Sequence, residues 1–202
     1  MIDGTDIHNY RVTIYAVRLA EAVGLGRRSI RSLIKGAFLH DVGKIGISDR
    51  ILMKPSRLTG EEFEVMKGHV RHGVDIVERS DWLKDATQVL GYHHEQYAGD
   101  GYPAGTEGKN IPITARIFTI ADVFDALTSK RPYKEPSDFD TAIDTLKKKR
   151  GRHLDPKLVD TFILIAKPLF DDLINGTYDR PCRKLEEILQ QYFSTEFETF
   201  RP

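Results

Sequence analysis

Histidine and aspartate side chains that could ligate metal ions recur between positions 8 and 122 of the 202-residue chain. They are His8, His40, Asp41, His69, His93, His94 and Asp122. Imidazole and carboxylate ligands together suit Fe, Mn, Zn, Co or Ni better than a metal that prefers thiolates. One histidine near a helix end is more often solvated than ligating, so the hypothesis of a metal site depends on the whole set.

The two adjacent histidines set a condition on the local fold. On a regular helix His93 and His94 would point about 100° apart, so both reach one metal ion only where the helix ends. Gly99 follows closely and favours such an end. Helices that converge in a bundle can point side chains of this kind into one cavity. The pattern therefore predicts a site that several helices share.

Apolar periodicity predicts the helices that must position these groups. They are expected over residues 6–23, 29–41, 59–77, 83–95, 112–129, 137–151, 155–175 and 183–193. Thr59 and Glu62 have the spacing of a capping box, and Pro168 is expected to kink or break its helix. The Gly-rich segments 42–55 and 97–112 are expected to be loops. No segment has the pattern of a convincing strand, so the expected fold class is all-α.

Composition and charge exclude several classes of protein. Lys and Arg together number 30, as do Asp and Glu, so no net field of either sign favours a nucleic-acid polymer or an anionic membrane. The single cysteine, Cys182, excludes an internal disulfide and fits a reducing compartment. The N-terminal residues lack the pattern of a signal peptide, and the apolar stretch 162–166 is too short to span a bilayer. We therefore expect a cytoplasmic protein that binds neither nucleic-acid polymers nor membranes.

Taken in order, these motifs resemble the HD-GYP domain, a branch of the HD metal-dependent phosphohydrolases. The segments that carry the resemblance are Leu39-His40-Asp41-Val42-Gly43-Lys44-Ile45-Gly46-Ile47, His93-His94-Glu95, Gly101-Tyr102-Pro103, and residues 121–129 with the following Arg131-Pro132-Tyr133-Lys134. The match runs from about His8 to about Phe162. It implies an all-α helical bundle over residues 1–165 with a metal centre between helices, and additional C-terminal helices over 166–202 packed on or beside it.

The resemblance also implies an activity. Members of the family hydrolyse the bacterial second messenger cyclic di-GMP to pGpG or GMP at a centre of two metal ions, commonly Fe or Mn, with Zn, Ni, Co and Mg as alternatives. By motif, Asp41 bridges the two ions. The other ligands divide into His8, His40 and Asp122 for one ion and His69, His93 and His94 for the other. Two ions about 3.5–4 Å apart can share a bridging hydroxide that attacks phosphorus in line.

Substrate contacts follow from the same resemblance. Lys44, three residues after the bridging aspartate, would contact the scissile phosphate, as lysine commonly does at phosphate groups. Arg131 and Lys134 match positions that bind the phosphates and guanine edges of the ligand. Tyr102 could stack on a base. The loop Gly101-Tyr102-Pro103 is also where a GGDEF-type protein could dock, and the apolar face of the last helix suggests a homodimer.

Two positions depart from the family pattern. Ala98 stands where an Asp is common in the loop after the adjacent histidines, and Asp100 could replace it after a small shift of the loop. Gly4 stands one helical turn before the first histidine, where members with three metal ions place a Glu. Because glycine offers no ligand, we expect two metal ions, and the alternative is a third ion held by Asp3 or Asp6.

Further expectations concern residues around the site and the alternatives to hydrolysis of cyclic di-GMP. Asp125, one turn after Asp122, is expected to orient a ligand histidine. His72 is expected to be packed or solvated, and His153 is expected to lie on the surface. A different cyclic dinucleotide or a nucleoside monophosphate could be the substrate. A non-hydrolytic sensor of the dinucleotide is the alternative from another class. The sequence leaves open whether the chain is a piece of a receiver or sensor fusion.

Overall fold

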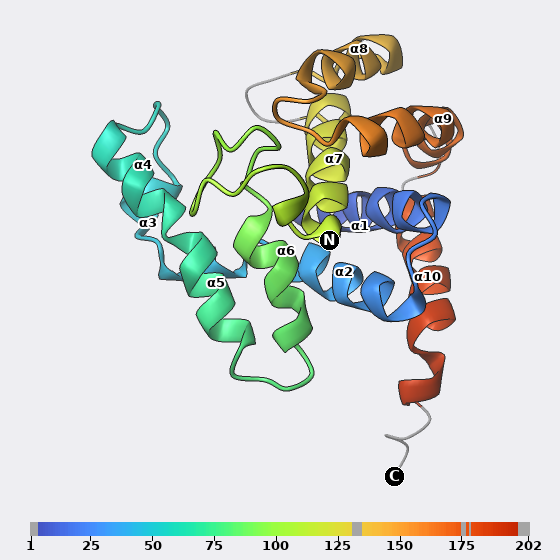
Figure 1. The fold of residues 1–202 in the computed structure, drawn as a ribbon, viewed down its shortest axis with the longest axis horizontal. Helices are drawn as coiled ribbons and strands as arrows, with labels where there is room; N and C mark the ends of the chain where they lie inside the picture. The colour runs from blue at the N-terminus through green and yellow to red at the C-terminus, as the bar shows by residue number, and fades with distance from the viewer. Residues whose placement is uncertain (1–3, 131–134, 175–176, 178, 198–202) are drawn as a thin grey trace.

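The computed structural model describes residues 4–130, 135–174, 177 and 179–197 (Figure 1). The α-helices are α1 (Gly4–Ala22), α2 (Arg27–Leu39), α3 (Asp49–Leu52), α4 (Gly60–Lys67), α5 (His69–Val77), α6 (Thr87–Tyr92), α7 (Ile113–Thr128), α8 (Phe139–Lys149), α9 (Pro156–Leu173) and α10 (Arg180–Phe197). Short 3₁₀ helices are η1 (Val42–Gly46), η2 (Lys84–Ala86) and η3 (Gly108–Asn110). Within these described ranges β pairing is limited to isolated bridges, so the predicted all-α fold is confirmed.

Helix α1 lies at the centre of the bundle, in contact with α2, α7, α9 and α10 (Figure 1). Residues 12–17 of this helix are all buried, because apolar neighbours surround it instead of covering one stripe. Tyr15 meets Phe124 of α7 and Phe162 of α9 edge to face, at centroid distances of 5.2 and 6.1 Å. This aromatic packing fixes α7 and α9 against α1 and so fixes the relative positions of the groups they carry.

A second group of elements, η1, α5 and α6, packs beside the end of α2. Gly43 of η1 lies against the backbone of α5 around Gly73, where a side chain on either residue would meet a neighbour. Val77, Ala86 and Leu90 form a small buried cluster that joins α5, η2 and α6. The chain therefore passes directly from α2 into a turn held against α5.

Several predicted boundaries need correction around this turn. Segment 42–55, expected to be a loop, contains η1 and α3. The helix expected over 59–77 is divided at Gly68 into α4 and α5, so His69 opens a new helix. The capping box is confirmed, because the Thr59 amide donates to the Glu62 carboxylate at 2.7 Å and the Glu62 amide donates to Thr59 Oγ1 at 3.3 Å.

The helix expected over 83–95 is shorter than the periodicity indicates. It consists of η2 followed by α6, which ends at Tyr92, so that His93 caps the helix and His94 lies beyond it. This is the end that two adjacent histidines need if both are to face one ion. The long loop after them is confirmed, with η3 as a single turn inside it.

The C-terminal part of the chain completes the core. Pro168 does not break α9, which runs unbroken across the predicted boundary between residues 165 and 166. Helix α10 packs on α1 and α2. The buried side chains of its apolar face are Leu185, Ile188, Tyr192 and Phe193. The face that suggested a homodimer is therefore covered within the chain. In the described part of the chain, none of the helices is long and apolar enough to cross a membrane.

Candidate metal centre

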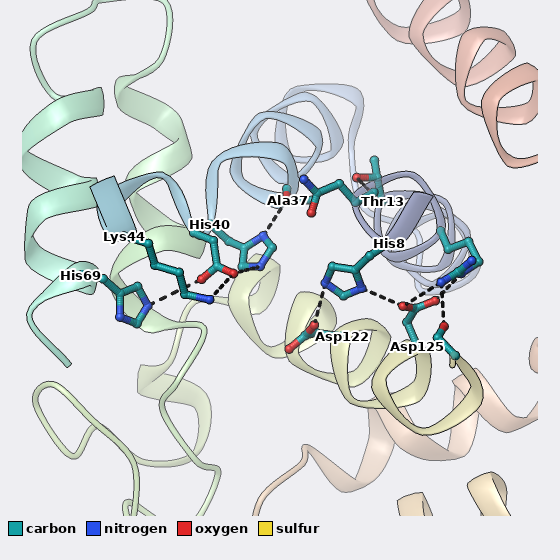
Figure 2. A network of polar contacts seen from close by, with 12 residues as sticks. His8, Thr13, Ala37, His40, Lys44, His69, Asp122 and Asp125 are labelled. Atoms are coloured by element: carbon teal, nitrogen blue, oxygen red, sulfur yellow. Dashed lines mark hydrogen bonds and ion pairs between the residues drawn. The ribbon is translucent and has the colours of Figure 1, made fainter. Parts of the chain in front are cut away.

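One cluster of potential ligands lies between α1, the end of α2 and α7. His8 comes from α1, His40 caps α2 and Asp122 lies on α7, and one ligand atom of each lies within 4.8 Å of the others. Nε2 of His8 is 3.5 Å from Oδ1 of Asp122. Figure 2 shows the His8 ring between Asp122 and Asp125. Two imidazoles and a carboxylate so arranged could hold one metal ion.

A second cluster consists of imidazoles alone. His69 opens α5, and His93 and His94 follow α6, with one ligand atom of each within 4.8 Å of the others. Nε2 of His69 lies 3.5 Å from Nε2 of His93. The rings of His69 and His94 are 5.1 Å apart at their centroids. The structure therefore brings together the three histidines that the sequence assigned to one ion.

Asp41 lies between the two clusters. Its Oδ2 is 3.2 Å from Nε2 of His40, and its Oδ1 is 3.8 Å from Nε2 of His69. The carboxylate therefore presents one oxygen to each cluster. Nζ of Lys44 lies 2.6 Å from Oδ2 of Asp41, one turn along the chain. A carboxylate in this position could ligate an ion in each cluster.

The ring orientations of the histidines fit a metal centre. Nδ1 of four rings is hydrogen-bonded to an acceptor: His8 to the Asp125 carboxylate at 2.7 Å, His40 to Ala37 O at 2.8 Å, His69 to Met66 O at 2.7 Å and His93 to Leu90 O at 2.9 Å. Because a carbonyl oxygen or a carboxylate only accepts, Nδ1 donates and Nε2 of the neutral ring keeps its lone pair. Metal-ligating histidines adopt this arrangement.

Burial and neighbouring charges set the protonation of the centre. Burial lowers the pKa of His93 and His69, and burial with the nearby His69 lowers the pKa of His94 to about 3. Burial opposes ionisation of Asp41, but the adjacent His40 and the ammonium of Lys44 outweigh it and hold the pKa of Asp41 well below its usual range. The three-histidine cluster thus favours neutral imidazoles and Asp41 a carboxylate, the forms that ligate metals.

Asp125 contacts His8 on the side away from Asp122. Its side chain is fully buried, and its Oδ2 accepts from Nδ1 of His8 at 2.7 Å. Nε of Arg11 donates to Oδ1 at 2.5 Å. Burial opposes ionisation, but the hydrogen bonds from His8 and Arg11 lower the pKa of Asp125. The contact expected of Asp125 is present, whereas Arg11 was missed although it lies one turn after His8 on α1.

Tyr102, which the resemblance suggests as a base-stacking residue, packs against one of the potential ligands. Its ring is stacked on His94, with centroids 4.6 Å apart and planes at 23°. The ammonium of Lys67 lies 5.5 Å from the centre of the Tyr102 ring, and Phe63 meets the ring edge to face. One face of Tyr102 is therefore used within the protein, against a potential ligand. Burial and the charge of Asp41 raise the pKa of Tyr102 to about 12, so its hydroxyl stays protonated.

Glu95 holds the loop that carries Tyr102. Its buried carboxylate accepts from the amide of Ala104 at 2.8 Å and from the amide of Thr106 at 3.1 Å. Glu95 lies directly after the adjacent histidines in the sequence, but its role as a clamp depends on where residues 104–106 fold back. The motif His93-His94-Glu95 is visible in the sequence, but this role of Glu95 is not.

The departure at Ala98 has a structural counterpart. The amide of Ala98 donates to Arg152 O at 2.8 Å, and Asp100 pairs with the Arg152 side chain at 3.3 Å. The amide of Tyr97 donates to His153 O at 3.0 Å. The loop after the histidines is thus tied to the α8–α9 turn, and Asp100 serves this attachment on the surface.

Two further histidines lie apart from both clusters. His72 is exposed beside Gly46, as expected of a solvated residue. His153 is half-buried under Tyr97 instead of lying free on the surface. Arg131 and Lys134 lie outside the described residues. Gly4 is the first residue of α1 and brings no ligand one turn before His8.

Comparisons with known proteins identify the family of the chain. The family described as "HD domain" matches residues 5–158. The chain is 42% identical over 83% of its length to the 3′3′-cGAMP-specific phosphodiesterase 2 of Vibrio cholerae, covering 34% of that protein. It is 40% identical over 83% of its length to a cyclic di-GMP phosphodiesterase of Thermotoga maritima, covering 46% of it. The chain thus spans about a third to a half of the length of these curated relatives.

The fold is similar to that of a solved structure. A crystal structure of a cyclic GMP-AMP specific phosphodiesterase of V. cholerae superposes with a TM-score of 0.70 at 18% identity, over 88% of this chain and 48% of that one. The resemblance inferred from the motifs is confirmed, and the chain belongs to the HD-domain family.

Proposed function

We propose that this chain is a metal-dependent phosphodiesterase that hydrolyses a cyclic dinucleotide, with cyclic di-GMP as substrate and pGpG or GMP as product. The observation that carries the proposal is the position of Asp41, with one carboxylate oxygen 3.2 Å from His40 and the other 3.8 Å from His69. A carboxylate between two ligand clusters is suited to a pair of ions on one phosphodiester.

The proposed cofactor is a pair of divalent metal ions, with Fe or Mn preferred and Zn, Ni, Co or Mg as alternatives. His8, His40 and Asp122 would hold one ion, His69, His93 and His94 the other, and Asp41 both. When bound, the ions would supply Lewis-acid stabilisation of a phosphoryl oxygen and lower the pKa of water.

Lys44 is the residue that we assign to the substrate phosphate. Its ammonium pairs with Asp41 at 2.6 Å, and its side chain is 38% exposed, so it lies at the open side of the centre. From there it would move from the carboxylate to a non-bridging oxygen of the scissile phosphate, as a point charge. Arg131, Lys134 and Tyr102 remain the proposed contacts with the second phosphate and the bases.

A mixed cyclic dinucleotide is the second candidate substrate. It is favoured by the V. cholerae relative, 42% identical, which is named for 3′3′-cGAMP. A cytoplasmic location and docking of a GGDEF-type protein at Gly101-Tyr102-Pro103 stay predictions. A homodimer stays a prediction too, but the apolar face of α10 no longer supports it, because that face is buried within the chain.

The test is turnover of cyclic di-GMP, 3′3′-cGAMP and cyclic di-AMP by protein loaded anaerobically with Fe²⁺ or Mn²⁺. Asp41→Asn should lose metal and turnover together. Lys44→Met should keep both ions while kcat falls about 100- to 1000-fold, because a charge that stabilises the transition state is lost. Chelation should abolish turnover in the wild type, and added metal should restore it.

A matched control comes from Lys54, which also pairs with a carboxylate, that of Glu62 at 2.5 Å, but lies outside both clusters. Lys54→Met should leave metal content and kcat unchanged. Full activity of Asp41→Asn would refute the mechanism. Two bound ions with dinucleotide binding but no turnover of any of the three substrates would instead favour the sensor.

A further inference from the structure

We propose that Arg11 is a positioning residue for the cluster of His8, His40 and Asp122, and that it acts through Asp125 on the ring of His8. The inference rests on the proposed metal centre and adds to it a residue that lies outside all the motifs. It concerns how one ligand is oriented, and it can be tested by metal binding without any hydrolysis.

The geometry joins the three side chains through one carboxylate. Nε of Arg11 donates to Oδ1 of Asp125 at 2.5 Å, and Nη2 donates to Oδ2 at 3.4 Å. The same Oδ2 accepts from Nδ1 of His8 at 2.7 Å. Nη2 of Arg11 also donates to Oγ of Ser129 at 2.7 Å, at the end of α7. The planar guanidinium thus fixes the orientation of the carboxylate that holds the imidazole.

Arg11 engages both oxygens of the fully buried Asp125 carboxylate, with Nε on Oδ1 and Nη2 on Oδ2. Without these contacts the carboxylate would be free to rotate away from the His8 ring. Held in place, it accepts the hydrogen of Nδ1 of His8. The lone pair of the neutral ring then lies on Nε2, 3.5 Å from Oδ1 of Asp122.

Position along the helices supports this role. His8 and Arg11 are one turn apart on α1, and Asp122 and Asp125 are one turn apart on α7, so each helix contributes one group to the cluster and one to its support. Figure 2 shows His8 between the two aspartates. Because α1 and α7 pack along each other, Arg11 and Asp125 hold the two helices in the register that the cluster needs.

The experiment titrates metal-free full chain with Mn²⁺ and follows free Mn²⁺ by electron paramagnetic resonance. The wild type should bind two ions. In Arg11→Met one ion should bind as in the wild type and the other about 10- to 100-fold more weakly, the usual loss when a residue supporting a ligand is removed. Arg11→Lys keeps the positive charge but not the planar guanidinium with its several donors. Its loss of Mn²⁺ affinity at the same site should therefore be smaller than that of Arg11→Met.

Arg116 provides the matched control. It lies on α7, the helix that carries Asp125, and pairs at 2.5 Å with the buried Asp155, which caps α9. The two pairs are alike in side-chain exposure, at 13% and 5% for Arg116 and Asp155 against 14% and 0% for Arg11 and Asp125. Arg116→Met should retain both Mn²⁺ affinities. Circular dichroism of each variant before the titration verifies the fold, and Arg11→Lys decides the matter if Arg11→Met does not fold.

The proposal is overturned if both affinities survive in the Arg11 variants, or if the Arg11 and Arg116 variants weaken both sites alike. A wild type that binds two Mn²⁺ ions but turns over no cyclic dinucleotide would refute the proposed function and leave the role of Arg11 in place. A wild type that binds no Mn²⁺ would refute both.

Discussion

A Cβ atom placed on Gly43 would lie 1.9 Å from the backbone carbonyl oxygen of His69, far inside contact distance. This approach sets the distance between η1, which follows Asp41, and α5, which His69 opens. Gly43→Ala should therefore push the two elements apart, at a cost of about 1–3 kcal/mol in the free energy of unfolding. It should also weaken metal binding at the three-histidine cluster.

The measurement is thermal or chemical unfolding together with the Mn²⁺ titration. Gly60→Ala is the control, because a Cβ at Gly60 meets nothing within 4 Å and the residue opens a helix. It should leave both quantities unchanged. Equal behaviour of the two variants would show that the Gly43 contact does not determine the site.

Tyr102 is predicted to act on metal binding through its stack on His94. Tyr102→Phe keeps the ring and should keep Mn²⁺ affinity. Tyr102→Ala removes an aromatic pair worth about 0.5–1.5 kcal/mol and should weaken one site about 2- to 10-fold. A raised KM in Tyr102→Ala with unchanged Mn²⁺ affinity would instead assign the residue to the substrate base alone.

Glu95 is predicted to hold the loop 97–112 in place. Glu95→Ala removes the charged acceptor of the Ala104 and Thr106 amides, worth about 1.5–3 kcal/mol for each hydrogen bond. Exchange of these two amides with deuterium should become at least tenfold faster. Glu107→Ala, an exposed change in the same loop, should leave their exchange unchanged. If both variants exchange alike, Glu95 is not the clamp.

His153 predicts a pH dependence of stability. Burial, with the charge of Lys149, lowers the pKa of His153 from 6.5 to about 4. Between these values the unfolded chain binds a proton that the folded chain does not, so stability is lost as the pH falls through this window, by at most about 3 kcal/mol. His153→Gln should remove this share of the loss.

The measurement compares urea unfolding of wild type and His153→Gln at pH 7.5 and pH 4.5. The other histidines contribute equally to both proteins and cancel in the difference. His72→Gln, at an exposed position, serves as the control. Identical losses in wild type and His153→Gln would contradict the prediction.

The sequence predicts the helices and the candidate ligand residues because both depend on local chemistry. His40, Asp41 and the adjacent His93 and His94 stand in short motifs, and helices form around them, although with ends that differ from the prediction. Arg11 and Gly43 could not be assigned in this way. Arg11 acts on a carboxylate 114 positions away, and Gly43 matters because of a backbone 26 positions away, so their roles exist only after the chain is folded.

Helix boundaries failed where tertiary contacts override periodicity. The apolar pattern continues through Gly68 and past Tyr92, yet the helices end there and present His69, His93 and His94 to one point. Pro168 shows the opposite case, because the helix continues through a residue that locally opposes it. The ends that matter for the site are thus set by packing.

The position of α10 determines where the chain can be cut. The matched HD domain ends at residue 158, but Ile188 and Tyr192 of α10 are buried against helices α1 and α2, and Tyr192 donates to Glu21 at 2.8 Å. Truncation at the family boundary would expose the flank of the very helix that carries His8, as an apolar strip prone to aggregation. The smallest unit worth expressing therefore retains the last helix, and fusion partners belong beyond it.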